Sequence, residues 1–466
     1  MKEVIELSSD QKNAIKTMFS FLKSSETAFL LVGNAGSGKT TVISEFIDLL
    51  QTQLSGVNIV DIALCAPTHQ ALSILSSKLG IQHKFSSKQR VELNTLHSLL
   101  NLRPDITLEK LDYRNLEFNS SNVAKRIREN TLIICDESSM INDPIHDQII
   151  EVCKLRRCKV IFVGDDAQLS PVSGIGKSKV FKTRPMARLT TNQRQLENSP
   201  LLSSLNILRK ESITQFKTEE SEETSIYTYN TESVKDYLTS MSGLFTLDVS
   251  NRDCINTKVL CYTNKRVDDY NRFIRKTIFK GNDTFYPGDF LKIESSRDRV
   301  GFNNHINKNV FADSVSSRSV SIMGNYYLTH VIKVIDSDGR SKELFVIDND
   351  EVVKNGTVIA EKLEKQRLEV LHKVKSNPRN SYMWSNYFTN LESFHTTSDL
   401  FFEGRVIKPK TVSYGYAETV HKAQGSQFNN IFLDIKNINR YTKDEERRQL
   451  QYVGLSRTKY NAFILQ

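Results

Sequence analysis

The sequence predicts an α/β protein with two parallel-sheet domains and an inserted β module. Short apolar runs recur within the first 190 residues, and each run ends in polar residues suited to chemistry. The same arrangement restarts at residue 258 and returns near the C-terminus. Strands of a parallel sheet are buried on both faces, so they appear as continuous apolar runs. The chain is also long enough for two or three domains with separate cores.

The segment 33–40, GNAGSGKT, predicts a binding site for a nucleoside triphosphate. It matches the pattern G-x-x-x-x-G-K-[ST] at every fixed position, behind the apolar run 28–32 and ahead of helix-spaced apolar residues in 41–50. Backbone N–H groups of such a loop cradle phosphates, Lys39 reaches the β and γ phosphates, and the Thr40 hydroxyl binds Mg²⁺. The predicted nucleotide-binding residues of this segment are Gly33, Asn34, Ala35, Gly36, Ser37, Gly38, Lys39, Thr40 and Thr41.

Two further strand ends supply candidate catalytic groups. Asp136 and Glu137 directly follow the apolar run 131–135, and Gln168 lies shortly after the run 160–163. We expect Asp136 to hold Mg²⁺, and Glu137 to orient or deprotonate the attacking water. Gln168 is placed to sense the γ-phosphate. In a doubly wound sheet the ligand binds beyond the carboxyl ends of the strands, which brings these groups to the phosphate-binding loop.

Two arginines are candidates for stabilising the transferred phosphoryl group. Arg194 lies in the segment NQRQ and Arg457 in the segment GLSRT. Phosphoryl transfer needs cations on the equatorial oxygens, and a neighbouring domain can supply them. A single arginine in isolation is more often a surface charge, so both predictions depend on the local pattern.

The amino-acid composition indicates what kind of partner the protein binds and in which cellular compartment it works. The net charge of +9 and the pI near 9.0 favour an acidic polymer such as nucleic acid. No apolar run approaches the roughly 20 residues that span a bilayer, and residues 1–6 lack the features of a secretion signal. The six cysteines include no C-x-x-C pair, which suits a reducing compartment and argues against a zinc site. We therefore expect a cytoplasmic protein without a membrane partner.

The stretch 286–404 predicts a small antiparallel module instead of a parallel sheet. Residues 331–336 alternate between apolar and polar, and the turn-forming residues 337–339 follow. A charged helix is predicted over 362–375, ended by Asn-Pro at 377–378, and such a helix is more often a solvated surface element than a binding element. The apolar residues near one face of this helix are Leu363, Leu368, Leu371 and Val374.

The order of the motifs resembles superfamily 1 helicases of the RecD-like branch, superfamily 1B. The segments that carry the resemblance are GNAGSGKT (33–40), APTHQAL (66–72), TLHSLL (95–100), DESSM (136–140), GDDAQLSPV (164–172), NQRQ (192–195), YTNKRVDDYN (262–271), TVHKAQGSQF (419–428) and YVGLSRTKY (452–460). They extend over nearly the whole chain. The length, the short insertion after residue 100 and the aromatic segment 384–394 resemble the phage Dda-like type. Gln427 departs from the glutamate that many members use to contact the ribose, which leaves the ribose contact open.

The resemblance implies two RecA-like domains, a hairpin insertion and an SH3-like β module. It places the first RecA-like domain at 1–190, with the hairpin at about 101–130. The second is formed by 191–285 together with 405–466. The inserted SH3-like module with a helical extension occupies 286–404.

The resemblance further implies an ATP-dependent DNA helicase that moves 5′ to 3′ on single-stranded DNA and unwinds duplex. ATP with Mg²⁺ would bind between the RecA-like domains, with Gln11 reading adenine and Gly425 touching the nucleotide. The implied partners are single-stranded DNA, forked duplex and a single-strand-binding or recombination protein. The implied setting is a monomer in replication or recombination, in the bacterial host cytoplasm if a phage encodes it. Residues implied to face the DNA strand are Pro67, Thr68, His69, Thr95, His97, Asn264, Lys265, Thr419 and His421.

Strand separation needs a wedge, and the resemblance places a hairpin pin at 103–120. Tyr113 and Phe118 are the candidate residues for stacking on DNA bases. Alternatively, Phe118 packs in a core beneath the hairpin. A second aromatic group has two interpretations as well, as a brace for the β module against the pin or as a small core. Its members are Trp384, Tyr387 and Phe388.

Other functions stay open from sequence. A translocase that mainly displaces bound proteins, or a helicase that prefers RNA, fits the same motifs, and the direction of movement rests on the resemblance alone. A P-loop kinase for small molecules would not need two arginine motifs and a second α/β domain. A nucleic-acid-binding protein with an inactive nucleotide site is disfavoured because the catalytic residues are intact. These residues are Lys39, Thr40, Asp136 and Glu137.

Overall fold

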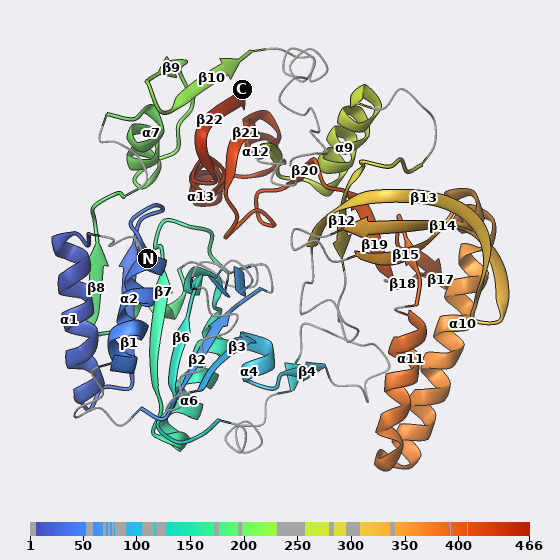
Figure 1. Cartoon of the computed structure of the whole chain (residues 1–466), viewed down its shortest axis with the longest axis horizontal. Helices are drawn as coiled ribbons and strands as arrows, with labels where there is room; N and C mark the ends of the chain where they lie inside the picture. The colour runs from blue at the N-terminus through green and yellow to red at the C-terminus, as the bar shows by residue number, and fades with distance from the viewer. Residues whose placement is uncertain are drawn as a thin grey trace.

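Two parallel sheets and a closed β-barrel form the framework of the protein in a computed structural model (Figure 1). This arrangement confirms the predicted fold class. The structure describes residues 6–52, 59–68, 71–72, 75–76, 79, 90–104, 116–117, 127–171, 177–193, 198–230, 257–278, 284–294, 308–335, 341–391, 393–407 and 409–466. Among the helices in these ranges, none combines the length and the apolar character needed to cross a membrane.

The first sheet contains the three strand ends that the sequence predicts. Its strands are, in spatial order, β3 (Arg90–Thr95), β2 (Asp61–Ala66), β6 (Leu132–Cys135), β7 (Lys159–Gly164), β1 (Ala28–Gly33) and β8 (Met186–Leu189), and all neighbours are parallel. The helices of this part are α1 (Ser9–Lys23), α2 (Lys39–Thr52), α4 (Leu96–Leu99) and α6 (Asp143–Arg156), with the 3-10 turns η2 (Ser138–Met140) and η3 (Lys179–Lys182). The parallel order brings the carboxyl ends of β1, β6 and β7 together at one edge.

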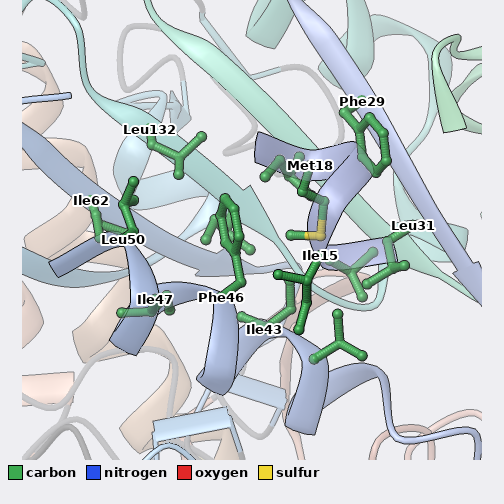
Figure 2. Packing of buried hydrophobic residues seen from close by; sticks show 14 of the residues in the cluster. Ile15, Met18, Phe29, Leu31, Ile43, Phe46, Ile47, Leu50, Ile62 and Leu132 are labelled. Atoms are coloured by element: carbon green, nitrogen blue, oxygen red, sulfur yellow. The ribbon is translucent and has the colours of Figure 1, made fainter. Parts of the chain in front are cut away.

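Side chains of the first sheet alternate between two cores. Phe29 and Leu31 of β1 pack with Met18 of α1 and Phe46 of α2 on one face, as Figure 2 shows. The intervening residues of β1 pack with α6 on the other face. Because helices cover both faces, the strands are buried throughout, which explains their uninterrupted apolar sequences.

The second sheet is parallel except at one edge. Its strands are β20 (Ala417–Thr419), β11 (Thr257–Cys261), β21 (Phe428–Asp434), β22 (Thr458–Leu465), β10 (Ser225–Tyr229) and β9 (Glu219–Glu220), of which only the β9–β10 pair is antiparallel. The helices of this part are α7 (Pro200–Leu208), α9 (Asn264–Ile278), α12 (Ile435–Tyr441) and α13 (Asp444–Leu455). The core between the sheet and α7, α12 and α13 also includes Ala167 and Leu169, from the loop after β7 of the first sheet.

The inserted module is a closed barrel of six strands. They are β12 (Phe290–Glu294), β13 (Lys308–Ile322), β14 (Asn325–Ile335), β15 (Ser341–Ile347), β16 (His395–Thr396) and β19 (Lys410–Tyr414). Strand β12 pairs with both β13 and β19, and this pairing closes the barrel. The closing strand β19 therefore comes from beyond the stretch 286–404 in which the sequence located the module.

A helical arm extends from the barrel. It contains α10 (Asn349–Ser376), the turn η5 (Pro378–Tyr382), α11 (Met383–Leu391) and a small hairpin of β17 (Leu400–Phe402) and β18 (Arg405–Ile407). The helix α10 ends before Asn377, as the sequence predicts, but it begins earlier, where the Asp348 side chain accepts a hydrogen bond from the Asp350 N–H. Placing Leu368 on the apolar face was wrong, because this side chain points to solvent and is 45% exposed.

Trp384, Tyr387 and Phe388 form a small core with the C-terminal half of α10. Their rings lie 5.3 to 6.1 Å apart and pack on Val370 and Leu371. This packing confirms the core interpretation for the aromatic group. It also shows that α10 is not simply a solvated helix.

The stem of the predicted hairpin is an antiparallel pair. Strand β4 (Arg103–Pro104) pairs with β5 (Leu116–Glu117), with Arg103 opposite Glu117. The candidate stacking residues Tyr113 and Phe118 lie outside the described residues, so the wedge stays a prediction.

Candidate functional site

A cavity of ≈ 340 Å³ lies between the two sheets and gathers most of the predicted catalytic groups. From the first sheet it is lined by Ala35, Gly36, Ser37, Gly38, Lys39, Thr40, Thr41, Ala71, Leu75, Asp136, Glu137, Gln168 and Gln193. From the second sheet it is lined by Gly425, Gln427, Ser456 and Arg457. Residues that are hundreds of positions apart thus meet at one site.

The phosphate-binding loop has the backbone that an anion site requires. It leaves β1 at Gly33 and enters α2 at Lys39, and Gly36 and Gly38 adopt positive φ values of 82° and 77°. The positive φ favours glycine at position 38, and a Cβ atom there would also lie 2.4 Å from Nε2 of Gln11. Lys39 Nζ donates to the carbonyls of Gly33 and Asn34 at 2.8 and 3.0 Å. Backbone amides, a lysine and a helix N-terminus are together the donor set that suits a triphosphate.

Gln11 on α1 braces this loop. Its Nε2 donates to the Ser37 carbonyl at 3.1 Å, and its Oε1 accepts from the Ser8 N–H at 3.0 Å in a capping box. The residue is only 2% exposed. The geometry connects Gln11 to the phosphate-binding loop, while adenine reading stays a prediction.

The neighbouring Asp10 holds the segment that leads toward Arg194. Its Oδ2 accepts the N–H groups of Thr190 and Thr191 at 2.8 and 3.0 Å, and the Gln193 N–H reaches the Gly36 carbonyl at 2.8 Å. Burial raises the pKa of Asp10, but hydrogen bonds from Ser8 and from these backbone amides outweigh it, and the net pKa is well below its ordinary value. Arg194 itself lies outside the described residues.

Asp136 and Glu137 stand at the end of β6, facing the loop. Glu137 adopts a left-handed backbone with φ of 49°, and its N–H donates to Asp136 Oδ1 at 2.8 Å. Burial and the charge of Asp136 raise the pKa of Glu137, against the opposing charges of Arg457 and Lys39. A carboxylate with a raised pKa is a better proton acceptor, which suits a general base. The Thr40 hydroxyl and the Asp136 carboxylate are oxygen ligands of the kind that Mg²⁺ prefers.

Gln168 joins the two sheets across the cavity. Its Oε1 accepts a hydrogen bond from Gln424 Nε2 at 3.1 Å, and the same nitrogen lies 3.3 Å from Ser139 Oγ. Ser139 belongs to the turn after Glu137, and Gln424 precedes Gly425. Gly425 has a positive φ of 87°, and a Cβ there would lie 3.7 Å from Glu137 Oε1. The backbone of Gly425, from the second domain, therefore lies close to the carboxylate of Glu137, the predicted base.

Arg457 approaches from the second sheet, just after α13. It is 5% exposed, and its guanidinium donates to the Val453 carbonyl, the Ser456 hydroxyl and the Ser426 carbonyl at 2.9 to 3.3 Å. Burial lowers the pKa of Arg457, while the negative charge of Glu137 raises it. The side chain is thus held against its own domain and borders the cavity.

The residues predicted to face DNA gather at the carboxyl ends of strands. Ala66, just before Pro67 and Thr68, lies opposite Thr95 in the β2–β3 pair. Cys261 lies opposite Thr419 in the β11–β20 pair of the second sheet. Each sheet thus presents two of these motif loops side by side.

Threonine hydroxyls shape the start of three of these loops. Thr68, Thr95 and Thr419 accept N–H groups of residues three positions ahead, at 3.2, 3.2 and 3.3 Å. Asn264 and Lys265 begin α9 and are exposed, and His97 is exposed on α4. His421 is half-buried, 5.8 Å from the Tyr262 ring, and burial lowers its pKa. His69 lies outside the described residues.

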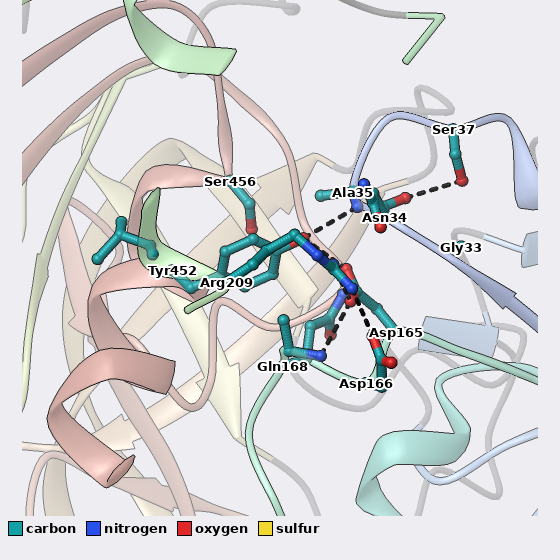
Figure 3. A network of polar contacts seen from close by, with 12 residues as sticks. Gly33, Asn34, Ala35, Ser37, Asp165, Asp166, Gln168, Arg209, Tyr452 and Ser456 are labelled. Carbon is teal, nitrogen blue, oxygen red and sulfur yellow. Dashed lines mark hydrogen bonds and ion pairs between the residues drawn. The ribbon is translucent and has the colours of Figure 1, made fainter. Parts of the chain in front are cut away.

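Sequence reasoning missed a polar cluster beside the phosphate-binding loop, shown in Figure 3. The Tyr452 hydroxyl donates to Asp165 Oδ2 at 2.7 Å and accepts from the Ala35 N–H at 3.2 Å. Arg209 donates to Asp165 Oδ1 at 2.9 Å and to Asp166 Oδ1 at 2.5 Å. Tyr452 lies within a motif segment, which was a signal that could have been followed. Arg209 had no such signal, because its role depends on where α7 ends in space.

Comparison with known proteins agrees with this geometry. A family model described as AAA domain matches residues 6–224, and one described as UvrD-like helicase C-terminal domain matches residues 414–465. The ATP-dependent DNA helicase dda of Enterobacteria phage T4 is 25% identical over 99% of this chain and 99% of its own. The RecBCD enzyme subunit RecD of Buchnera aphidicola subsp. Acyrthosiphon pisum is 22% identical over 92% of this chain and 68% of its own.

Solved structures show the same fold. The Pif1 helicase from Candida albicans has a TM-score of 0.52 at 16% identity, covering 99% of this chain and 95% of its own. The Pif1 helicase from Bacteroides in complex with ADP-AlF3 and ssDNA has a TM-score of 0.50 at 16% identity, covering 98% and 92%. The family models, these relatives and the shared fold agree with the motif order and the cavity between the sheets. The chain therefore belongs to the superfamily 1B helicases of the RecD and Dda type.

Proposed function

We propose that this chain is an ATP-dependent DNA helicase that moves 5′ to 3′ along single-stranded DNA and unwinds duplex. The observation that carries the proposal is that Glu137 and Arg457 border one cavity from two different sheets. A site completed by two domains is sensitive to their relative position, so hydrolysis and domain movement are coupled. The proposed domains are 1–190 with the hairpin at about 101–130, 191–285 with 405–466, and the module 286–404, whose barrel is completed by β19 from the segment 405–466.

Each group of the cavity has a proposed role in ATP hydrolysis. The loop amides and Lys39 bind the phosphates, and Thr40 and Asp136 hold Mg²⁺, which would neutralise charge on the phosphate oxygens. Glu137 orients water and accepts its proton. Arg457 stabilises the charge that develops on the transferred group, and Gln168 senses the γ-phosphate. Roles for Arg194, Gln11 and Gly425 follow from the family resemblance.

Single-stranded DNA is proposed to cross the carboxyl edges of both sheets. The paired motif loops begin at Thr68, Thr95 and Thr419, whose hydroxyls hold the loop backbones, and Lys265 and His97 are exposed beside them. Such groups suit phosphate and sugar contacts, which position a strand without reading its sequence. The net charge of +9 supports the same partner. Tyr113 and Phe118 remain the proposed wedge.

The first test is steady-state ATP hydrolysis with and without single-stranded DNA. We expect strong stimulation by DNA, because the strand favours the closed arrangement of the two domains. Lys39→Ala removes the phosphate contact and is expected to abolish turnover in both conditions. Equal turnover of the unaltered protein with and without DNA would contradict the coupling.

The second test compares forked duplexes with a 5′ tail, a 3′ tail or an RNA 5′ tail. We expect unwinding from the 5′ DNA tail only. Faster unwinding from the 3′ tail would refute the proposed direction, and faster unwinding from the RNA tail would favour the RNA alternative. DNA-stimulated ATPase without unwinding of any duplex would instead indicate a translocase.

A further inference from the structure

The hydroxyl of Tyr452 is fully hydrogen-bonded at the contact between the two sheets. It donates to Asp165 Oδ2 at 2.7 Å and accepts from the Ala35 N–H at 3.2 Å and from Arg209 Nη1 at 3.3 Å (Figure 3). These contacts use one donor and two acceptor positions, which is the full capacity of the group. The side chain is 1% exposed. One atom thus connects α13 with the phosphate-binding loop, the loop after β7 and the end of α7.

Tyr452 and Arg457 share the last turn of α13 and the residues just beyond it. The Ser456 N–H donates to the Tyr452 carbonyl at 2.9 Å, and Arg457 Nε donates to the Val453 carbonyl at 3.1 Å. A shift of this turn therefore moves the guanidinium directly. Because Ala35 belongs to the phosphate-binding loop, the Tyr452 hydroxyl links that loop to the turn that carries Arg457.

Helix α13 is also attached to the loop after β7, independently of the hydrogen bond between Tyr452 and Ala35. Gln449 exchanges two hydrogen bonds with Ser170, at 3.3 and 3.2 Å, and Leu169 is packed in the core of the second sheet. The loop after β7 is thus bound firmly to α13. The Ala35 side chain also packs against the core that contains α13. Among the described hydrogen bonds of α13, the one at the Tyr452 hydroxyl reaches the phosphate-binding loop.

We propose that Tyr452 is a positioning residue for ATP hydrolysis, which fixes Arg457 at the distance from the phosphate-binding loop that catalysis requires. This inference rests on the proposed ATPase function. Removing only the hydroxyl keeps the Arg457 side chain but removes the hydrogen bonds that hold the turn carrying it. The variant should therefore lose stabilisation of the transition state more than affinity for ATP.

The test is Tyr452→Phe, with Tyr416→Phe as a matched control. Tyr416 is also 1% exposed, and its hydroxyl likewise lies between a buried aspartate, Asp289, and the backbone N–H of Phe290. It packs in the core between α9 and the barrel and does not line the cavity. For Tyr452→Phe we expect kcat to fall about tenfold with KM for ATP changed less than about twofold. For Tyr416→Phe we expect kcat to be unchanged, with a similar decrease in melting temperature for both variants.

A double-mutant cycle shows whether Tyr452 acts through Arg457. In an Arg457→Ala background, Tyr452→Phe should cause no further loss of kcat. Additive losses, an unchanged kcat in Tyr452→Phe, or an equal loss in Tyr416→Phe would each overturn the inference. If Tyr452→Phe does not fold, Arg209→Lys replaces it, because lysine cannot bridge Asp165 and Asp166, and the same loss confined to kcat is expected.

The design separates this inference from the proposed function. An unaltered protein that hydrolyses ATP no faster than Lys39→Ala would refute the ATPase proposal and the role of Tyr452 with it. Normal hydrolysis in the unaltered protein and in Tyr452→Phe would refute the role of Tyr452 alone.

Discussion

A buried aspartate is contacted by a tyrosine hydroxyl and by an arginine at two places, beside the cavity and where α9 meets the barrel. The interface triad consists of Tyr452, Asp165 and Arg209, and the barrel triad consists of Tyr416, Asp289 and Arg275. In each set the aspartate is at most 1% exposed and also accepts a backbone N–H, at 3.1 and 2.7 Å. The chemistry of the two sets is therefore nearly the same.

The difference lies in what each triad connects. The barrel triad joins α9 to the segments flanking β12 and β19, which are already joined by the barrel strands. Arg275 also packs between the rings of Tyr286 and Tyr414, each 5.0 Å away. The interface triad instead joins two sheets and reaches the phosphate-binding loop. The comparison teaches that residue types alone do not separate a structural cluster from a functional one, whereas the elements they connect do.

The largest effect is expected from Glu137→Gln, a substitution beside the interface triad. We expect kcat to fall by about 10²–10⁴-fold, the usual contribution of a general base. The melting temperature should not decrease, because the substitution removes a carboxylate whose pKa is raised by burial and by Asp136. DNA-stimulated hydrolysis and thermal unfolding of one preparation measure both, and nucleotide binding should persist. A full rate in this variant would mean that another group accepts the proton.

The next largest effect is expected at the barrel triad, with Arg275→Met. The substitution leaves the Asp289 carboxylate buried without its cation, which costs about 3–5 kcal/mol of unfolding free energy near neutral pH. Burial already raises the pKa of Asp289. A carboxyl whose folded-state pKa exceeds its unfolded value destabilises the fold above that pKa, and the cost decreases as the folded protein takes up a proton.

Urea unfolding at two pH values measures this dependence. The loss in Arg275→Met should be smaller at about pH 5 than at about pH 8, while kcat per folded molecule stays unchanged. Equal losses at both pH values, or a large loss of kcat, would break the distinction between the two triads.

The smallest effect concerns Lys258, which lies beside the barrel triad. Its ammonium is 4.8 Å from the centre of the Phe290 ring and donates to the Gly415 carbonyl. Burial lowers the pKa of Lys258 from 10.5 to about 8. Between these values the unfolded chain keeps the proton and the folded protein releases it, so stability rises with pH across this range.

The variant Lys258→Met lacks this titration. The unfolding free energy of the unaltered protein should therefore gain about 1–2 kcal/mol relative to Lys258→Met between about pH 8 and about pH 9.5. Denaturant unfolding of the two proteins in parallel measures the difference. A constant difference across this range would show that Lys258 is not buried as a titrating group.

The first sheet could be predicted because its signals are local. Each strand end combines a buried apolar run with adjacent polar residues, as in 28–40 and 131–137, and these segments form β1 and β6 with their loops. The same locality explains why the end of α10 was predicted. The cavity is lined by the predicted residues Lys39 and Glu137.

The barrel closure and the interface triad could not be predicted, because both depend on contacts between distant segments. Strand β16 contains two residues, and β19 lies beyond the region that alternates, so neither has a pattern of its own. Arg209 becomes important only when α7 ends beside Asp165. The helix α10 begins ahead of the predicted 362–375 and includes Gly356, a residue that usually disfavours a helix and that here lies close to Leu400 of β17.

The packing of Ala167 and Leu169 in the core of the second sheet has a consequence for dissecting the molecule. A fragment that stops after β8 would keep a complete first sheet but expose both side chains and lose the partners of Asp165, Gln168 and Ser170. The complementary fragment would lack two side chains of its own core. The boundary between the domains along the chain therefore does not separate two units that fold independently. The halves are expected to be soluble and native only when they are expressed together.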